Sequence, residues 1–216
     1  MAGNKPKPWE AVSADRPGEG TLRRRRVLIV CEDSKSSCLY FRAFNIDSER
    51  AEVVAVGTGK NTDSLVEEAV ARKKSAENRR EPYNQVWSVF DRDSFPLANY
   101  SRAFELANAN RIKVAWANEA FELWYLLHFS YHDCGISRDA YKQKLAACGI
   151  SDYDKADAGM YDKVLPHQET AIRNARKLEK HWHEMGTRFP ERENPSTAIH
   201  KLVEFLNELL ELGPAQ

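Results

Sequence analysis

The sequence predicts an α/β protein with a mainly parallel central sheet flanked by helices, followed by a C-terminal helical extension. Short continuous runs of β-branched and apolar residues are typical of strands buried on both faces, as in a parallel sheet. These runs alternate with segments of helical periodicity between residues 27 and 117. After Asn118 only helical patterns follow, and none of them predicts a further strand with comparable clarity.

The first two strand–helix units are expected before residue 80. An apolar run at 27–31 predicts a strand that ends at Glu32 and Asp33, and the serine-rich segment 34–37 can cap the following helix. A second strand is expected at 53–56. After a Gly-Thr-Gly turn, a helix is expected over about 63–78, with Asn61 or Thr62 as its N-cap.

Two further strands are expected at 85–90 and 112–117, with a helix at about 100–109 between them. The third strand ends in the sequence Asp91-Arg92-Asp93. Alternation at these lengths implies right-handed crossovers and therefore parallel strands.

The later part of the chain has helical periodicity at 119–129, 140–147, 170–183 and 195–212. In the last of these, Asn194 is the expected N-cap and Pro195 the first helical residue. An apolar stripe then predicts that this helix docks on the core; its members are Ile199, Leu202, Val203, Leu206 and Leu209. Segment 149–168 has no clear pattern.

These patterns divide the chain into a flexible leader at 1–22 and a single domain at 23–216. Within that domain, about 23–130 form the α/β core and 131–216 the mainly helical extension.

Composition limits the function. Lysine plus arginine and aspartate plus glutamate number 32 each, so a protein that coats nucleic acid through bulk charge is disfavoured. A local cluster of positive charge, such as the four arginines at 23–26, can still bind a nucleic-acid backbone. It is equally well explained as a solvated basic segment that precedes a strand. The four cysteines form no CxxC pair, and no apolar run approaches the roughly 18 residues of a membrane span. A cytoplasmic protein without membrane contact is expected.

Three carboxylates at strand ends carry the chemical prediction. Ligands gather at the carboxyl ends of parallel strands, where Glu32 and the pair Asp91 and Asp93 are placed. If the first and third strands are neighbours, the three side chains converge and repel one another unless a hard cation such as Mg²⁺ binds them. The alternative is that Asp91-Arg92-Asp93 forms a solvated turn.

Four segments of the sequence resemble the RloB family, which belongs to the wider Toprim group shared by topoisomerases, bacterial primases and OLD-type nucleases. They occur in the same order and span roughly residues 23 to 212: RRRRVLIVCEDSKSSCLYF, VFDRDSF, WANEAFELWYLLHF and NPSTAIHKLVEFL.

The resemblance implies a Toprim-like core in which Glu32 is the first-strand glutamate and Asp91 and Asp93 are the DxD pair. It also implies a role in antiphage defence or abortive infection. One position departs from the family pattern, because Asn118 is followed by Glu119 where proline is expected. Glu119 is either an extra ligand or, as we favour, a favourable charge in the first turn of a helix.

Other polar residues have two interpretations each. Glu122 lies in an apolar stretch, so it is either a ligand of a second metal or the partner of a buried lysine or arginine. His128 fits a hydrogen-bonded core histidine better than a ligand. Lys35 and Arg92 are placed to neutralise a phosphate. His128, His132 and Cys134 lack a fourth ligand at a spacing typical of zinc sites.

We therefore expect a nuclease that depends on Mg²⁺ or Mn²⁺ and hydrolyses RNA, including tRNA, or DNA. Its catalytic residues are expected to be Glu32, Asp91, Asp93 and Lys35, with Glu122 as a further metal ligand. A nucleotidyl transferase is a second reading, although no loop dedicated to an incoming nucleotide is evident. A non-catalytic sensor, or a subunit that binds a protein partner from a defence locus, is the third.

Overall fold

A five-stranded sheet forms the centre of the computed structural model, which describes residues 24–49, 51–92, 97–187 and 190–211. The strand order is β2-β1-β3-β4-β5. The first four strands are parallel, and β5 pairs antiparallel with β4. The strands are β1 (Arg25–Cys31), β2 (Ala51–Gly57), β3 (Gln85–Asp91), β4 (Lys113–Asn118) and β5 (Ser196–Thr197). The sequence-based prediction of an α/β fold with a mainly parallel sheet is confirmed, while the proposed leader at 1–22 lies outside the described residues.

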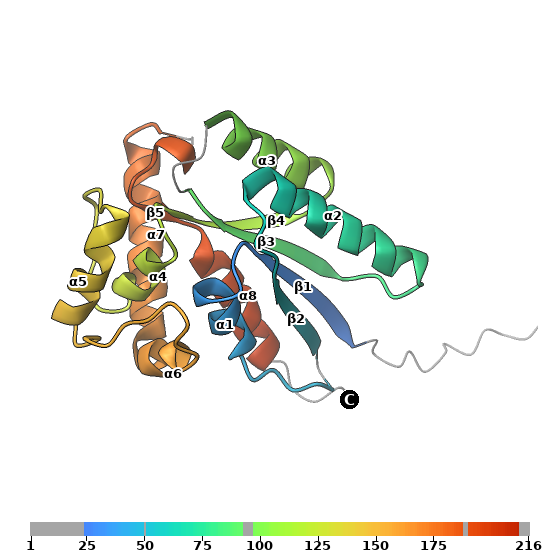
Figure 1. The fold of residues 1–216 in the computed structure, drawn as a ribbon, viewed down its shortest axis with the longest axis horizontal. Coiled ribbons are helices and arrows are strands. Elements are labelled where there is room, and N and C mark those ends of the chain that lie inside the picture. The colour runs from blue at the N-terminus through green and yellow to red at the C-terminus, as the bar shows by residue number, and fades with distance from the viewer. Residues whose placement is uncertain (1–23, 50, 93–96, 188–189, 212–216) are drawn as a thin grey trace, which may run out of the picture.

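Helices cover both faces of this sheet (Figure 1). On one face, α2 (Thr62–Asn78) and α3 (Leu97–Ala109) enclose a core that contains Leu28 and Val30 of β1. On the other, α1 (Ser36–Arg42) and α8 (Ile199–Glu211) pack over a core that contains Val27, Ile29 and Cys31. Alternate residues of β1 are thus buried on opposite faces, which explains the continuous apolar run in the sequence.

A second group of helices lies beyond the carboxyl ends of the strands (Figure 1). It contains α4 (Glu122–Leu127), α5 (Tyr141–Ala147), α6 (Met160–Val164) and α7 (Gln168–Glu184). Two short 3₁₀ turns lie within this group: η1 (Arg138–Ala140) precedes α5, and η2 (Leu165–His167) connects α6 to α7. A third, η3 (Pro190–Arg192), lies between α7 and β5. The predicted buried helix at 119–129 is therefore confirmed in type but is shorter, and the residues of α4 are all buried.

The C-terminal helix is docked as predicted, but its start differs. The five apolar stripe residues of α8 are fully buried. Asn194 and Pro195 neither cap nor begin it; their peptide bond is cis, and they lead into β5. Ser196 and Thr197 pair with the end of β4, and the Thr197 hydroxyl accepts a hydrogen bond from the Ile199 N–H at 3.1 Å. A strand of two residues has too short a pattern to be predicted from sequence.

The turn after β2 packs closely against the loop after β1, which carries Glu32 and Asp33. The turn after β2 donates backbone hydrogen bonds to the end of β1, from Thr58 N–H to the Cys31 carbonyl (3.1 Å) and from Gly59 N–H to the Glu32 carbonyl (2.8 Å). At Gly57 the turn touches the loop after β1. A Cβ there would lie 2.3 Å from the backbone oxygen of Asp33, so only glycine fits.

We predict that Gly57→Ala displaces the loop that carries Glu32 and Asp33. The added methyl group overlaps backbone atoms that a rotamer change cannot move, so the free energy of unfolding should fall by about 1–3 kcal/mol. Gly135→Ala is the control, because a Cβ at that position meets its nearest atoms at 3.7 Å. Chemical denaturation of both variants tests the account. Equal stabilities would show that the two loops are not held together as described.

Candidate active site

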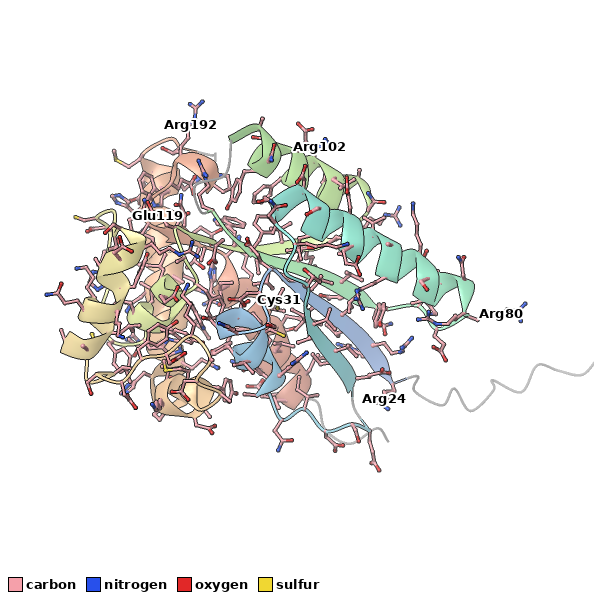
Figure 2. The ribbon with its side chains drawn as sticks, in the orientation of Figure 1. Arg24, Cys31, Arg80, Arg102, Glu119 and Arg192 are labelled. Carbon is pink, nitrogen blue, oxygen red and sulfur yellow. The ribbon has the colours of Figure 1, made fainter. Side chains whose placement is uncertain are left out.

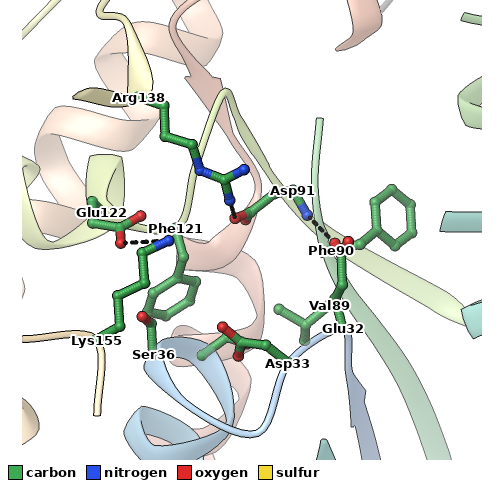
Figure 3. A pocket seen from close by; sticks show the side chains of 11 residues that line it. Glu32, Asp33, Ser36, Val89, Phe90, Asp91, Phe121, Glu122, Arg138 and Lys155 are labelled. Atoms are coloured by element: carbon green, nitrogen blue, oxygen red, sulfur yellow. Dashed lines mark hydrogen bonds and ion pairs between the residues drawn. The ribbon is translucent and has the colours of Figure 1, made fainter. Parts of the chain in front are cut away.

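Glu32 and Asp91 meet at the carboxyl ends of two neighbouring parallel strands, as the sequence suggested. β1 pairs directly with β3, and Asp91 is the last residue of β3. The Glu32 N–H donates to the Val89 carbonyl at 3.0 Å, which extends the pairing one residue past β1. The Glu32 Oε2 atom then accepts a hydrogen bond from the Asp91 N–H at 3.1 Å (Figure 3). The carboxylate of Glu32 is thereby fixed against the end of β3.

A small pocket of about 90 Å³ opens beside these two acids. Its polar lining comes from the loop after β1, the end of β3, the start of α4 and the helical group. The polar residues in this lining are Glu32, Asp33, Ser36, Ser37, Asp91, Glu122, Arg138 and Lys155. The pocket therefore joins the α/β core to the later helices.

Asp91 faces a cation that the sequence did not reveal. Its Oδ2 atom lies 3.7 Å from Arg138 Nη2, and Figure 3 shows the guanidinium reaching across the pocket to the carboxylate. The Asp91 side chain is 18% exposed and that of Arg138 is 45% exposed. The arginine offsets part of the negative charge at the carboxyl ends of the strands.

Glu122 is the most buried acid of the pocket. Its Oε1 atom accepts a hydrogen bond from the Tyr153 hydroxyl at 2.7 Å and lies 3.3 Å from Lys155 Nζ. Burial and the charge of Glu122 raise the pKa of Tyr153, so the phenol stays protonated and donates. A lysine partner was one of the two expected explanations for this acid. The other oxygen, Oε2, is buried and has no hydrogen-bond partner among the described residues.

Lys35 and Asp33 belong to the loop between β1 and α1. Asp33 Oδ1 accepts hydrogen bonds from the Lys35 N–H (3.2 Å) and the Ser37 hydroxyl (3.3 Å), which shape the start of α1. Lys35 is exposed and lines a second hollow that also contains Glu122, Arg138 and Lys155. Lys35 is therefore near the pocket but is not part of its lining.

The structure describes three of the four predicted metal ligands, Glu32, Asp91 and Glu122. Asp93 lies outside the described residues, and within the described ranges no group of three or more His, Cys, Asp or Glu side chains is close enough to hold a metal ion. Mg²⁺ typically takes one or two protein carboxylates and completes its shell with water and substrate phosphate. The hard oxygen donors of Glu32 and Asp91 fit that requirement.

Glu119 has a structural position that differs from the favoured prediction. Because α4 begins at Glu122, Glu119 precedes the helix and does not occupy its first turn. Its carboxylate accepts hydrogen bonds from the Arg138 N–H (3.2 Å) and from Asn194 Nδ2 (3.4 Å). The neighbouring Asn118, joined to Glu119 by a cis peptide bond, donates to the Glu193 carbonyl at 2.8 Å. These contacts connect the end of β4 to the segments that carry Arg138 and Asn194.

His128 is a buried, hydrogen-bonded core histidine, as predicted. Its Nδ1 atom lies 2.8 Å from the Trp124 carbonyl, one turn back along the chain. Burial lowers the pKa of His128 to about 4, so the ring is neutral at pH 7 and Nδ1–H donates.

Arg24, Arg25 and Arg26 lie at the start of β1, at the opposite end of the strand from Cys31 (Figure 2). Arg26 forms a salt bridge with Glu52 at 2.9 Å, and its guanidinium lies over the Tyr83 ring. The seven residues of β1 separate this end from Glu32 by about 20 Å. Arg24–Arg26 are therefore not positioned to contact a phosphate in the pocket.

Sequence reasoning missed Arg138, Tyr153 and Lys155. Tyr153 and Lys155 belong to the stretch that had no readable pattern, and Arg138 stands in a short 3₁₀ turn. The one available signal was Glu122, because an acid in an apolar stretch requires a partner. That requirement does not say where along the chain the partner lies.

Comparison with models of protein families matched residues 27–206 to the model described as RloB-like protein. This chain belongs to the RloB-like family. The matched range contains every residue that lines the pocket. A search of curated proteins and a search of solved structures each gave no match to this RloB-like chain. Across the part of the chain that the structure describes, helices are too short or too polar to span a membrane.

We predict that His128 makes stability depend on pH. Its pKa is about 4 in the folded protein and about 6.5 unfolded, so the unfolded state binds more protons between these values. The contribution is complete above about pH 6.5 and declines as pH falls toward 4. Between pH 7 and 5, the wild type should lose about 2 kcal/mol more unfolding free energy than His128→Asn. Equal losses in urea denaturation would place His128 in a solvated environment.

Proposed function

We propose that this RloB-like protein is a divalent-metal-dependent nuclease with a Toprim-type site at the carboxyl ends of β1 and β3. Its substrate is the phosphodiester backbone of RNA, including tRNA, or of DNA, and its role is in antiphage defence. The main support is that Glu32 and Asp91 meet in one pocket that also contains two cations. The defence role rests on kinship with the RloB family alone.

Glu32 and Asp91, together with Asp93, would hold Mg²⁺ or Mn²⁺. Such an ion stabilises the negative charge that develops on a phosphate during hydrolysis. The Asp91 N–H orients the carboxylate of Glu32. The turn at Gly57 packs against the loop after β1 and so fixes the backbone of that glutamate. Lys35 lies on the rim of the adjoining hollow, where a positive charge would favour the approach of a polyanion.

A non-catalytic role in sensing or in binding a protein partner is the second candidate. The observation that favours it is that Asp91 and Glu122 both have cationic partners within the protein. The pocket acids are thus partly neutralised without a metal. Purified protein that binds nucleic acid or a partner but never cleaves a phosphodiester would support this alternative.

We predict that Glu32→Gln and Asp91→Asn each lower metal-dependent cleavage at least about 100-fold, because each keeps the side-chain shape and removes a charge. Stability should change by less than about 1 kcal/mol, since the Asp91–Arg138 pair is long and partly exposed. Glu105→Gln, an exposed residue of α3, is the control. Cleavage of tRNA, single-stranded RNA and plasmid DNA with Mg²⁺, Mn²⁺ or EDTA is measured beside thermal melting. Full activity in both variants would exclude the proposed site.

A further inference from the structure

Two cations from the later part of the chain face the acids of the pocket. Arg138 stands at the start of η1, and Lys155 lies in the segment before α6. Figure 3 shows both side chains entering the pocket from the side opposite Glu32. The Arg138 side chain pairs with Asp91, and that of Lys155 pairs with Glu122.

The two ion pairs have the same asymmetry. The cations are 45% and 43% exposed, whereas their acids are 18% and 4% exposed. The separations of 3.7 and 3.3 Å are longer than those of charge-assisted hydrogen bonds. A long pair with an exposed cation adds little to stability, so Arg138 can leave the partly exposed Asp91 at small cost. Moving Lys155 costs more, because Glu122 is buried, and the contact of Lys155 with a phosphate must offset that cost while Tyr153 still donates to Glu122. The acids stay in place, because Asp91 is the last residue of β3 and Glu122 is buried at the start of α4.

A second observation concerns the buried acid of this pocket. Glu122 Oε2 is buried without a hydrogen-bond partner among the described residues, although Oε1 has both Tyr153 and Lys155. A buried carboxylate oxygen normally has a partner. A phosphodiester has no hydrogen to donate to this oxygen, but a shift of Lys155 toward a phosphate would open the carboxylate to water.

The shape of the surface favours an extended anion. The pocket adjoins a second, open hollow of about 550 Å³, and the two share Glu122, Arg138 and Lys155. Four cations line this second hollow beside three acids; the cations are Lys35, Arg138, Lys142 and Lys155, and the acids are Glu122, Asp139 and Asp154. A single phosphate would not use all four, whereas consecutive phosphates of a nucleic-acid strand would.

We propose that Arg138 and Lys155 bind phosphates of a nucleic-acid strand, and that their contacts with Asp91 and Glu122 belong to the resting state. The inference rests on the proposed function insofar as the released Asp91 then binds the divalent cation. When a phosphate draws Arg138 away, the site loses a competing positive charge next to Asp91. Phosphate binding and cation binding therefore strengthen each other by the same factor.

The first experiment measures phosphate binding without cleavage. Fluorescence anisotropy in EDTA follows labelled single-stranded RNA and DNA oligonucleotides of the same length. Arg138→Gln and Lys155→Gln should each weaken binding about tenfold and lower the slope of log affinity against log salt by about 0.7. RNA and DNA should be affected alike, because the contact is to phosphate.

Two matched controls come from elsewhere on the surface. Arg102, on α3, has one ion pair at 3.6 Å and is 65% exposed; Lys180, on α7, has one at 3.6 Å and is 75% exposed. Arg102→Gln and Lys180→Gln should leave affinity and salt slope unchanged. If the pocket variants bind as the controls do, the proposal is wrong.

The second experiment titrates Mn²⁺ alone into each protein by calorimetry. Arg138→Gln should bind Mn²⁺ several-fold more tightly than wild type, because a competing cation is gone. The Mn²⁺ titration is then repeated with the DNA oligonucleotide present, at a low temperature at which no cleavage occurs. The oligonucleotide should raise the affinity of the wild type for Mn²⁺ but not that of Arg138→Gln. If Arg138 were purely structural, its replacement would lower the Mn²⁺ affinity or leave it unchanged, both with and without the oligonucleotide. That result would overturn the exchange of partners.

The two hypotheses fail in different ways. If wild type binds no Mn²⁺, the proposed metal function and the exchange at Asp91 are refuted, but the EDTA experiment still decides whether Arg138 and Lys155 bind phosphate. If wild type binds Mn²⁺ and the pocket variants keep full affinity for the oligonucleotides, the metal site stands and the phosphate assignment is refuted. Thermal melting of each variant excludes unfolding as the cause of a loss.

Discussion

The hydrogen bonds between the end of β1 and the end of β3 determine where the candidate site forms. Backbone pairing continues through Glu32 N–H to the Val89 carbonyl, and the Glu32 side chain then accepts from the Asp91 N–H. Both strands are buried by helices on their two faces, so neither can slide without moving its core residues. The register of two hydrophobic strands therefore sets the position of two charged residues.

Charge compensation then connects the sheet to the later helices. Acids that lie close together at one edge of the sheet repel one another, and their burial removes stabilising contacts with water. Arg138 and Lys155 offset this cost for Asp91 and Glu122, and they come from segments outside the first four strand–helix units. The residues after 130 thus complete the site as well as cover the sheet; β5 and α8 extend the sheet and its core.

Regular, strongly patterned features could be predicted from the sequence, and pairings between distant segments could not. The apolar run before Glu32 and the strand before Asp91 indicated both the sheet and the edge where the candidate site lies, because burial on two faces leaves a visible pattern. The pairing of Glu122 with Lys155 joins residues in segments without periodicity, so it depends on tertiary packing alone. The start of α8 was misjudged for a related reason, since the pairing of Ser196 and Thr197 with β4 overrode the local capping signal of Asn194 and Pro195.

The central claim is that Glu32 and Asp91 form the protein part of a divalent-cation site. The most direct measurement is an anomalous difference map from crystals of the full-length protein soaked in Mn²⁺, recorded at the manganese absorption edge. The account predicts a peak within coordinating distance, about 2.0–2.6 Å, of carboxylate oxygens of both Glu32 and Asp91. A map with full manganese occupancy elsewhere and no peak beside these two carboxylates would contradict it.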